Sequence, residues 1–345
     1  MKIPKHILVI RLSAMGDVAM MVPVLTNVAQ EYPGIKFTLL TKKQFAPLFE
    51  DLSNVIVFEA DIRGKHKGIP GLKRLAKELR KEGIDAVADL HNVLRSNVLK
   101  AWFSFYGIPV KQINKGRKEK KALTRPENKI FKQLKTTHQR YADVFDALGV
   151  PVDVSTFESL KIKTLTPEVR KITGTQPKKW LGIAPFAQHA SKVYPIDLME
   201  EVLKELEKDL QLQIFLFGGG SKEIEILDQW ESNYSNATSM AGKVSFKDEL
   251  ALISNLDAML SMDSGNGHLA ANFRIPVITM WGLTHPFTGF APYGQPKNHQ
   301  LLPDLEKYPQ IPTSVYGKTV PEGYENAMRS ISPEMVVKKI KEVAP

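Results

Sequence analysis

The sequence predicts an α/β protein of two domains, each built on a parallel β-sheet. Apolar runs of strand length alternate with longer amphipathic runs through most of the 345 residues, which is the pattern of βα units. A chain of this length also exceeds one small domain. The alternation loosens after Gly149 and resumes at Trp180. We therefore expect a linker around residues 160–177, between two halves of similar size.

In the first half, the strands are expected where β-branched and apolar residues cluster, and the helices where apolar residues follow a helical period. The predicted strands are 7–11, 37–41, 55–58, 86–90 and 110–113. The predicted helices are 19–31, 72–82, 96–105 and 139–148.

The same reasoning applies to the second half. Its predicted strands are 180–184, 213–217, 258–261 and 276–281. Its predicted helices are 196–209, one from residue 222, 246–254, one after residue 267, and 333–343. The last of these is entered through Pro333, a residue favoured in the first turn of a helix.

Composition limits the possible classes of protein. The chain has no cysteine, so disulfides, thiolate metal sites and a thiol nucleophile are excluded, and a cytosolic protein is expected. The first apolar run, 7–10, is shorter than the core of a signal peptide. No segment reaches the ~20 apolar residues of a membrane span. Any contact with a membrane is therefore expected to be peripheral.

Positive charge is concentrated in residues 111–140. The chain carries a net charge of +10, and this segment holds eleven Lys or Arg against two acidic residues, Glu119 and Glu127. Such a cluster favours an anionic partner, because screened charges act over only ~8–10 Å. A solvated loop is the alternative interpretation.

Residues 7–25, ILVIRLSAMGDVAMMVPVL, raise the first question about function. A predicted strand ends near Arg11, and Asp17 follows at the start of the next helix. The stretch lacks both G-x-G-x-x-G and a G-K-S/T phosphate loop, which disfavours nicotinamide or flavin oxidoreductases and P-loop enzymes. A carboxylate beside a helix N-terminus stays ionised. Asp17 can therefore cap the helix or accept a proton from a substrate hydroxyl.

In the second half, Asp263 to His268 (DSGNGH) lie between a predicted strand and a helix. Glycines there allow close approach of a ligand, and the N–H groups of the helix start suit a diphosphate. Gly218 to Gly220 repeat this arrangement, with a simple tight turn as the alternative. Lys192 follows the strand at 180–184 and can neutralise a leaving phosphate. A D-x-D metal motif is absent from both stretches.

Four stretches in this order resemble the heptosyltransferases, glycosyltransferase family 9: RLSAMGDVAMMVPVL, the loop of Lys192, MDSGNGHLAA and PVITMWGLTHPFTGFAPYG. DLHNVLRSN and HQRYADVFDALGVP extend the resemblance over nearly the whole chain. It implies a GT-B fold, with two Rossmann-like domains facing a central cleft. Residues 1–165 would bind the acceptor, 176–325 the donor, and a final helix at 333–345 would cross back to the first domain.

The resemblance also implies the reaction. Family members carry out inverting, metal-independent transfer from a nucleotide diphospho-sugar, usually ADP-L-glycero-D-manno-heptose, to the inner core of lipopolysaccharide. No cofactor and no metal are expected. The implied partners are the nucleotide sugar, an anionic glycolipid and the cytoplasmic face of the inner membrane, with no nucleic acid.

Site residues follow from the family motifs. The resemblance implies that Asp17 is the general base and Lys192 the phosphate ligand. The implied donor-binding residues are Asp263, Ser264, Gly265 and His268, with Thr284 in the turn that follows. Ser191 and the glycine turn at Gly218 and Gly219 are expected to bind the donor as well. An anionic acceptor would also give the basic segment a role. The acceptor-binding residues are therefore expected to be Lys118, Lys120, Lys121 and Arg140 of that segment, with Gly16 and Arg95. The chain departs from the usual pattern at Ser264, at Asn266–Gly267 and in the turn GLTHP.

Three alternatives stay open at this point. The chain could be a sugar-nucleotide 2-epimerase of the same architecture, or a family 9 enzyme with a different nucleotide sugar. It could also be a nucleic-acid binder built on residues 111–140. Single-strand binding needs stacking rings among the cations, and Phe131 is the one suitable ring in that segment, so this last alternative is disfavoured.

Overall fold

The computed structural model describes residues 3–174 and 178–344. The chain divides into two compact units. The first is Met1–Lys115 with Thr136–Glu158, and the second is Gly116–Lys135 with Ser159–Pro345. The units therefore part just before the predicted linker at 160–177, part of which forms a short helix, α6 (Pro167–Thr173). Residues 175–177 of that linker lie outside the described residues.

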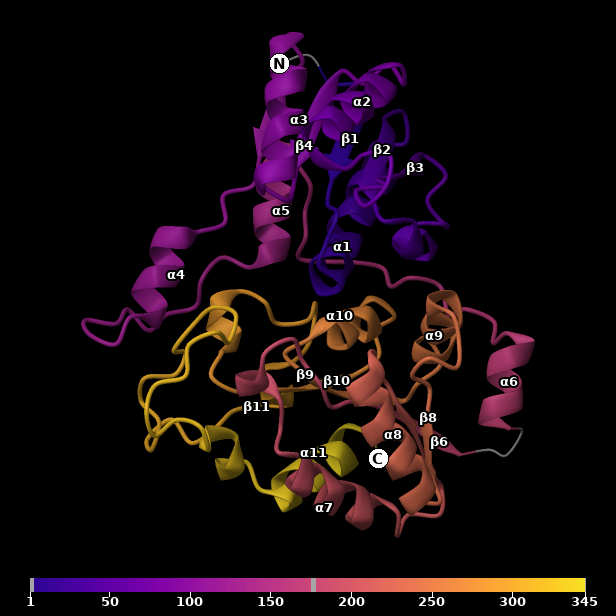
Figure 1. The fold of residues 1–345 in the computed structure, drawn as a ribbon, viewed down its shortest axis with the longest axis vertical. Coiled ribbons are helices and arrows are strands. Elements are labelled where there is room, and N and C mark those ends of the chain that lie inside the picture. Colours follow the sequence, from indigo (N-terminus) through magenta and orange to yellow (C-terminus); the bar gives the residue numbers. More distant parts are fainter. Residues whose placement is uncertain (1–2, 175–177, 345) are drawn as a thin grey trace. The chain divides into compact units, whose positions relative to one another are not determined.

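The first unit is built on a parallel sheet with the strand order β3-β2-β1-β4-β5 (Figure 1). Ile7 of β1 pairs with Phe37 of β2 on one side and with Ala86 of β4 on the other. The order of the strands reverses between β1 and β4, and open α/β sheets bind ligands beyond the carboxyl ends of the strands at such a point. The strands are β1 (His6–Ile10), β2 (Lys36–Thr41), β3 (Val55–Glu59), β4 (Ala86–Asp89) and β5 (Val110–Gln112).

The helices of the first unit cover this sheet with apolar faces. In α2, Leu72, Leu75 and Leu79 share one face and join Leu99 and Phe103 of α3 in a buried core. The helix at 72–82 was predicted from this helical spacing of leucines. The helices are α1 (Met15–Glu31), the 3₁₀ helix η1 (Lys43–Leu48), α2 (Gly68–Arg80), α3 (Leu94–Phe105) and α5 (Thr137–Asp146).

The second unit repeats the architecture, with the parallel order β11-β10-β9-β6-β7-β8. Its strand order reverses between β6 and β9, which gives a second switch point. Two short strands, β8 and β11, were not predicted. The strands are β6 (Lys179–Ala184), β7 (Leu212–Leu216), β8 (Ala237–Ser239), β9 (Ala258–Met262), β10 (Val277–Met280) and β11 (Gln300–Leu301).

The helices of the second unit include one in the basic segment, where none was expected. This helix is α4 (Arg117–Thr124). The other helices are η2 (Ala190–Lys192), α7 (Ile196–Leu206), α8 (Ser221–Asn233), α9 (Phe246–Ile253), α10 (Gly265–Asn272), η3 (Pro286–Thr288), η4 (Lys297–His299), η5 (Ala327–Ser330) and α11 (Pro333–Val343).

The final helix packs on the second unit, and its expected return to the first domain stays a prediction. Val336, Val337 and Ile340 of α11 are buried in the core of the second unit. The helix packs against α7, β9 and β10 (Figure 1). The apolar face of the helix was visible in the sequence, but it carried no information about which domain it would cover.

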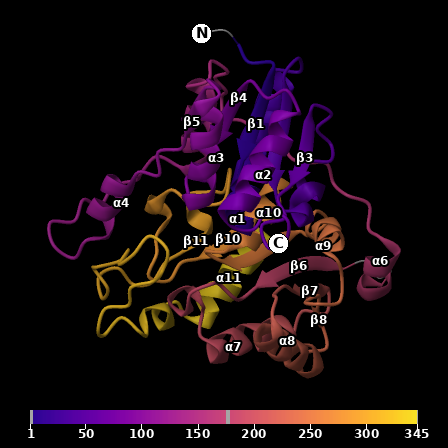
Figure 2. The same cartoon turned by 45° about the horizontal axis from the view of Figure 1, so that its top comes forward.

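The basic segment 116–135 also belongs to the second unit, although the sequence placed it in the first. The backbone N–H of Leu134 donates to the carbonyl of Phe287 at 3.0 Å. The ammonium of Lys129 donates to the carbonyl of Pro312 at 3.0 Å. Figure 2 shows α4 on the same side as the loops that follow β10 and β11. The chain thus leaves the first unit after Lys115 and returns at Thr136.

Within residues 3–174 and 178–344, no helix combines the length and the apolar character needed to cross a membrane.

Candidate functional site

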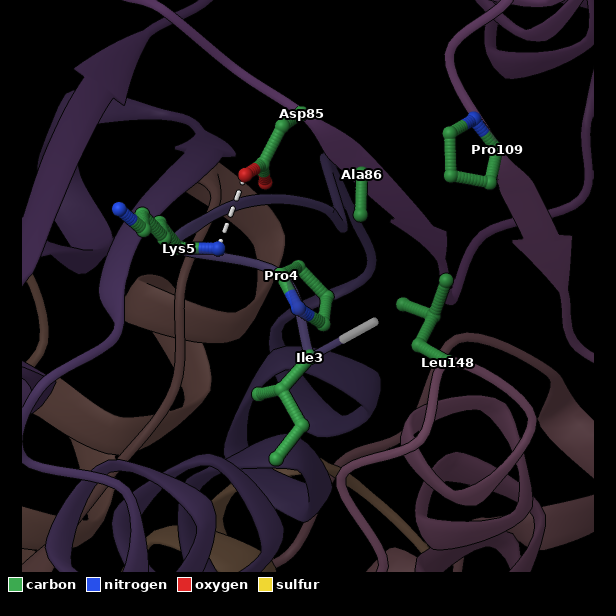
Figure 3. Close-up of a pocket in the computed structure, with 7 residues that line it drawn as sticks. All are labelled: Ile3, Pro4, Lys5, Asp85, Ala86, Pro109 and Leu148. Atoms are coloured by element: carbon green, nitrogen blue, oxygen red, sulfur yellow. Dashed lines mark hydrogen bonds between the residues drawn. The ribbon is translucent and has the colours of Figure 1, made fainter. Parts of the chain in front are cut away.

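One cavity of the first unit lies at the wrong end of the sheet to be the active site. It has a volume of about 380 Å³ and is lined by Pro4, Asp85, Pro109 and Leu148, among others (Figure 3). Lys5 and Asp85 directly precede β1 and β4, and the backbone N–H of Lys5 donates to the Asp85 carboxylate at 2.9 Å. Ligands of parallel α/β sheets bind at the carboxyl ends of the strands, so the functional groups are expected at that edge.

Asp17 lies at that carboxyl end in the first unit, in the first turn of α1 and next to Gly16. Its Oδ2 atom forms an ion pair with the guanidinium of Arg11, the residue that directly follows β1. The same oxygen accepts the backbone N–H of Ala14 at 3.2 Å. Asp17 therefore caps its helix, as one interpretation expected, and it is also held by a buried cation that the sequence reasoning did not use.

Arg11 and Tyr141 hold the loop of Asp17 in place. Arg11 is buried, and its Nη1 donates to the carbonyl of Leu90 at 2.7 Å. The hydroxyl of Tyr141 on α5 donates to the backbone carbonyl of Asp17 at 3.2 Å. The Arg11 guanidinium lies 5.8 Å from the centre of the Tyr141 ring. The sequence did contain a sign of this pairing, because Arg11 directly follows a predicted buried strand. Arginine is almost never buried without a partner, so a nearby carboxylate such as Asp17 could have been expected to pair with it.

His91 is a further group at this edge that the sequence analysis missed. It follows β4, the strand beside β1, and is 8% exposed. Its backbone N–H donates to the Asp89 carboxylate at 2.9 Å. Burial, together with the positive charge of Arg11, lowers the pKa of His91 to about 4. The imidazole is therefore neutral near pH 7.

The predicted acceptor cations separate into two groups. Arg95 is exposed in the first turn of α3, and Lys118 and Lys121 are exposed on α4. Lys120 and Arg140 are buried instead, and their predicted contact with the acceptor stays a prediction. The ammonium of Lys120 lies 4.1 Å from the centre of the Phe290 ring, and Arg140 donates to the carbonyl of Asn114 at 3.1 Å.

Other exposed cations follow the strands of the first sheet. Lys43 comes after β2, and Arg63, Lys65 and Lys67 come after β3. These residues lie in the loops at the carboxyl edge, the same edge as Asp17 and Arg95. Individually they looked like ordinary solvated cations in the sequence, and only the strand order places them along one edge.

In the second unit, three residues predicted for the donor site form one group, in which Asp263 and Thr284 are buried and Lys192 is partly buried. The ammonium of Lys192 lies 2.8 Å from Oδ2 of Asp263. The hydroxyl of Thr284 donates to the same oxygen at 2.9 Å. These residues follow β6, β9 and β10, which are neighbours in the sheet, so their carboxyl ends meet at one edge. The network holds the ammonium of Lys192 at the switch point of the second sheet.

Glycines fix the backbone around Lys192. A Cβ atom on Gly282 would lie 1.9 Å from the carbonyl oxygen of Ser191, a distance that no side chain tolerates. The N–H of Leu283 donates to that same carbonyl at 3.1 Å. The hydroxyl of Ser191, predicted to bind the donor, donates to the carbonyl of Gly317. In this arrangement Ser191 shapes the loop of Lys192.

The start of α10 has the features of an anion site. The helix begins at Gly265, and no side chain caps it. The hydroxyls of Ser264 and Ser261 lie 3.2 Å apart. Gly267 is explained by packing, because a Cβ atom there would lie 3.2 Å from Oγ of Ser261. His268 is buried on the helix, and its predicted contact with the donor stays a prediction.

The turn at Gly218 and Gly219 differs from a phosphate loop. The N–H of Gly219 donates to the carboxylate of Glu223 at 2.8 Å. A negative charge at this position disfavours a diphosphate on the same turn. Carboxylates accept hydrogen bonds from hydroxyl groups, so the turn suits the hydroxyls of a nucleotide sugar better than its phosphates.

His285 anchors the turn that follows Thr284. Its Nδ1 accepts the N–H of Phe287 at 3.1 Å. The ring of Phe131, from the basic segment, lies 5.0 Å from the His285 ring and 4.9 Å from Phe287. Burial, with the nearby charge of Lys129, lowers the pKa of His285 to about 4. The turn GLTHP is therefore held by packing of its side chains, and it lies beside the Lys192 network.

In the part of the chain that the structure describes, no group of three or more His, Asp or Glu side chains could hold a metal ion.

Known proteins similar to this chain support one family. Residues 72–319 match the family model of "Glycosyltransferase family 9 (heptosyltransferase)". The chain is 26% identical to the lipopolysaccharide core heptosyltransferase OpsX of Haemophilus influenzae, over 86% of this chain and 84% of that protein.

Solved structures agree on the fold. A family 9 glycosyl transferase from Veillonella parvula superposes with a TM-score of 0.76 at 19% identity, covering 99% of this chain and 97% of that one. The ADP-heptose LPS heptosyltransferase II of E. coli gives 0.68 at 18% identity, covering 98% of each chain. With the two parallel sheets, these matches confirm the predicted α/β fold of the GT-B class. The chain belongs to glycosyltransferase family 9, the heptosyltransferase family, and is a glycosyltransferase.

Proposed function

We propose that this enzyme is an inverting heptosyltransferase that transfers heptose from ADP-L-glycero-D-manno-heptose to an inner-core lipopolysaccharide acceptor. The observation that carries the proposal is that each sheet has a charged group at its switch point and that the two groups have opposite charges. The first sheet presents a carboxylate, Asp17, and the second presents a cation, Lys192, beside an uncapped helix start. The names of the similar proteins, which include an ADP-heptose enzyme, support the choice of donor and acceptor.

The second unit would bind the donor. A lysine ammonium has three N–H donors, and Asp263 is the one partner of Lys192 in the described residues. Two donors therefore remain for phosphate oxygens, and the first N–H groups of α10 add further ones. Asp263 then positions Lys192, while Glu223 at the Gly219 turn would accept hydroxyls of the nucleotide.

The first unit would supply the base. Oδ2 of Asp17 is occupied by Arg11 and Ala14, whereas Oδ1 has no hydrogen-bond partner among the described residues. Oδ1 would accept the proton as the acceptor hydroxyl oxygen attacks the anomeric carbon. The bond from that carbon to the diphosphate oxygen breaks, its electron pair leaves with the phosphate, and Lys192 offsets the new charge. Attack opposite the leaving group inverts the anomeric centre.

The acceptor would bind along the carboxyl edge of the first sheet. Lys43, Arg63, Lys67 and Arg95 give that edge an exposed positive charge, which suits the carboxylate and phosphate groups of an inner-core glycolipid. Such an acceptor is part of a membrane, so the enzyme would work at the cytoplasmic face of the inner membrane by peripheral contact. Lys118 and Lys121 would contribute to the same attraction.

The test is a donor screen followed by a transfer assay. Thermal shift should show stabilisation by ADP-heptose above that by UDP- and GDP-sugars. Transfer to a truncated core acceptor should then give a product of inverted anomeric configuration by NMR. Stronger stabilisation by another nucleotide sugar would contradict the choice of donor. Epimerisation of the nucleotide sugar in the absence of an acceptor would contradict the transferase proposal and support an epimerase.

A further inference from the structure

A loop of the second unit, residues 313–319, closes over the stem of Lys192. Gly317 has φ +78°, and a Cβ atom there would lie 2.8 Å from Cγ and Cδ of Lys192 and from Oγ of Ser191. The carbonyl of Gly317 accepts the Ser191 hydroxyl. The backbone at Gly317 is thus in direct contact with the side chain proposed to bind the donor phosphate.

Hydrogen bonds hold this loop in one shape. The hydroxyl of Thr313 donates to the carbonyl of Thr319 at 2.7 Å. The backbone N–H of Thr313 donates to the carbonyl of Leu283, which follows β10, at 3.0 Å. These hydrogen bonds hold the loop at the same edge of the sheet as Thr284. They also fix the backbone position of the residue before Gly317.

That residue is Tyr316, an aromatic side chain that is 50% exposed. Its ring centre lies 5.7 Å from that of Phe290, with an interplanar angle of 41°. Phe290 in turn contacts the ammonium of Lys120, 4.1 Å from its ring centre. Contact with Phe290 restrains the tyrosine ring, and half of the tyrosine stays exposed.

The chemistry of the donor determines what lies beside Lys192. In a nucleotide diphospho-sugar the anomeric carbon is bonded to an oxygen of the terminal phosphate. A group that binds this phosphate therefore has the sugar ring within a few ångströms. The C–H groups on a sugar face are apolar and can pack on an aromatic ring, and a phenol hydroxyl can bond a sugar hydroxyl.

We infer that Tyr316, supported by Phe290, determines the specificity of the donor site by packing its ring against the transferred sugar. The inference rests on the proposed function, because it takes Lys192 as the phosphate ligand. Tyr316 thus contacts the glycosyl part of the donor and makes no contribution to binding of the nucleoside diphosphate.

Calorimetry can separate these contributions. Dissociation constants are measured for ADP-heptose and for ADP with the wild type, Tyr316→Ala and Tyr316→Phe. Tyr316→Ala should weaken ADP-heptose by about 5- to 10-fold and leave ADP within about twofold, the loss expected for one aromatic contact. Tyr316→Phe keeps the ring and should bind ADP-heptose nearly as the wild type does. Phe105→Ala, which removes an exposed ring from α3 of the first unit, is the matched control and should change neither constant.

Two results would overturn the inference. Equal weakening of ADP-heptose and ADP by Tyr316→Ala would mean that the loop only supports Lys192. An unchanged donor constant with a raised KM for the acceptor would place Tyr316 in the acceptor site. Failure of the wild type to bind ADP-heptose at all would instead overturn the proposed function, and the comparison would then use the preferred nucleotide sugar and its diphosphate.

Discussion

The ion pair of Lys192 and Asp263, in the proposed donor site, allows a quantitative prediction about the stability of the second unit. The two charges are 2.8 Å apart, and their side chains are 14% and 8% exposed. At an effective dielectric constant of about 20, their attraction is about 6 kcal/mol. Desolvation of both ions offsets most of this. Removal of one partner is different, because it leaves the other charge buried and costs about 3 kcal/mol.

Lys192→Met and Asp263→Asn should therefore each lower the free energy of unfolding by about 3 kcal/mol. The double variant should lose about as much as either single one, which gives a coupling of at least ~2 kcal/mol. Urea denaturation followed by tryptophan fluorescence measures these values, since Trp180, Trp230 and Trp281 all lie in the second unit. Lys208→Met, which breaks the exposed pair with Glu205, is the matched control and should cost under ~0.5 kcal/mol. Additive losses in the double variant, or single losses as small as in the control, would refute a coupled buried pair.

Two further predictions concern the backbone beside Lys192 and the buried histidine of the first unit. Gly282→Ala should weaken binding of ADP by at least ~10-fold, because its Cβ must displace the Ser191 carbonyl from a 1.9 Å contact; calorimetric binding like that of the wild type would contradict this reasoning. Burial lowers the pKa of His91 to about 4 in the folded protein, against about 6.5 in the unfolded chain. Between these pH values the unfolded chain therefore binds more protons than the folded protein. The stability associated with neutral His91 is lost as the pH falls from about 6.5 to 4. His91→Gln should reduce the pH slope of the unfolding free energy in this window by up to ~1.4 kcal/mol per pH unit, and an unchanged slope in urea denaturation would exclude His91 as its source.

Much of the fold follows from local patterns. Runs such as Ile7 to Ile10 predicted buried strands, and the proline and apolar periodicity of 333–343 predicted the last helix with its observed bounds. The loops of Asp17, Lys192 and Asp263 were also predicted from strands that end in polar or glycine-rich turns. In each case the information lies within one element and its neighbours in sequence.

The remaining features depend on contacts between distant segments. The sequence does not reveal that Arg11 is paired with Asp17, that Gly317 packs on Lys192, or that the Ser191 hydroxyl is used within the fold. The burial of Lys120 and Arg140 was not predicted, because their partners come from other segments. The passage of residues 116–135 to the second unit is of the same kind, since charge and periodicity do not identify the surface a segment will cover.

The role of Asp17 as the base is tested most directly by Asp17→Asn. The amide oxygen can still accept the N–H of Ala14, and the side chain keeps its size. Loss of the ion pair with Arg11 affects the first unit, whereas the proposed donor residues lie in the second, so ADP-heptose should bind with an unchanged dissociation constant. Transfer to the acceptor should fall by about 10²- to 10⁴-fold, because an amide accepts no proton from the attacking hydroxyl. A variant that binds ADP-heptose normally and transfers heptose at the wild-type rate would contradict the account.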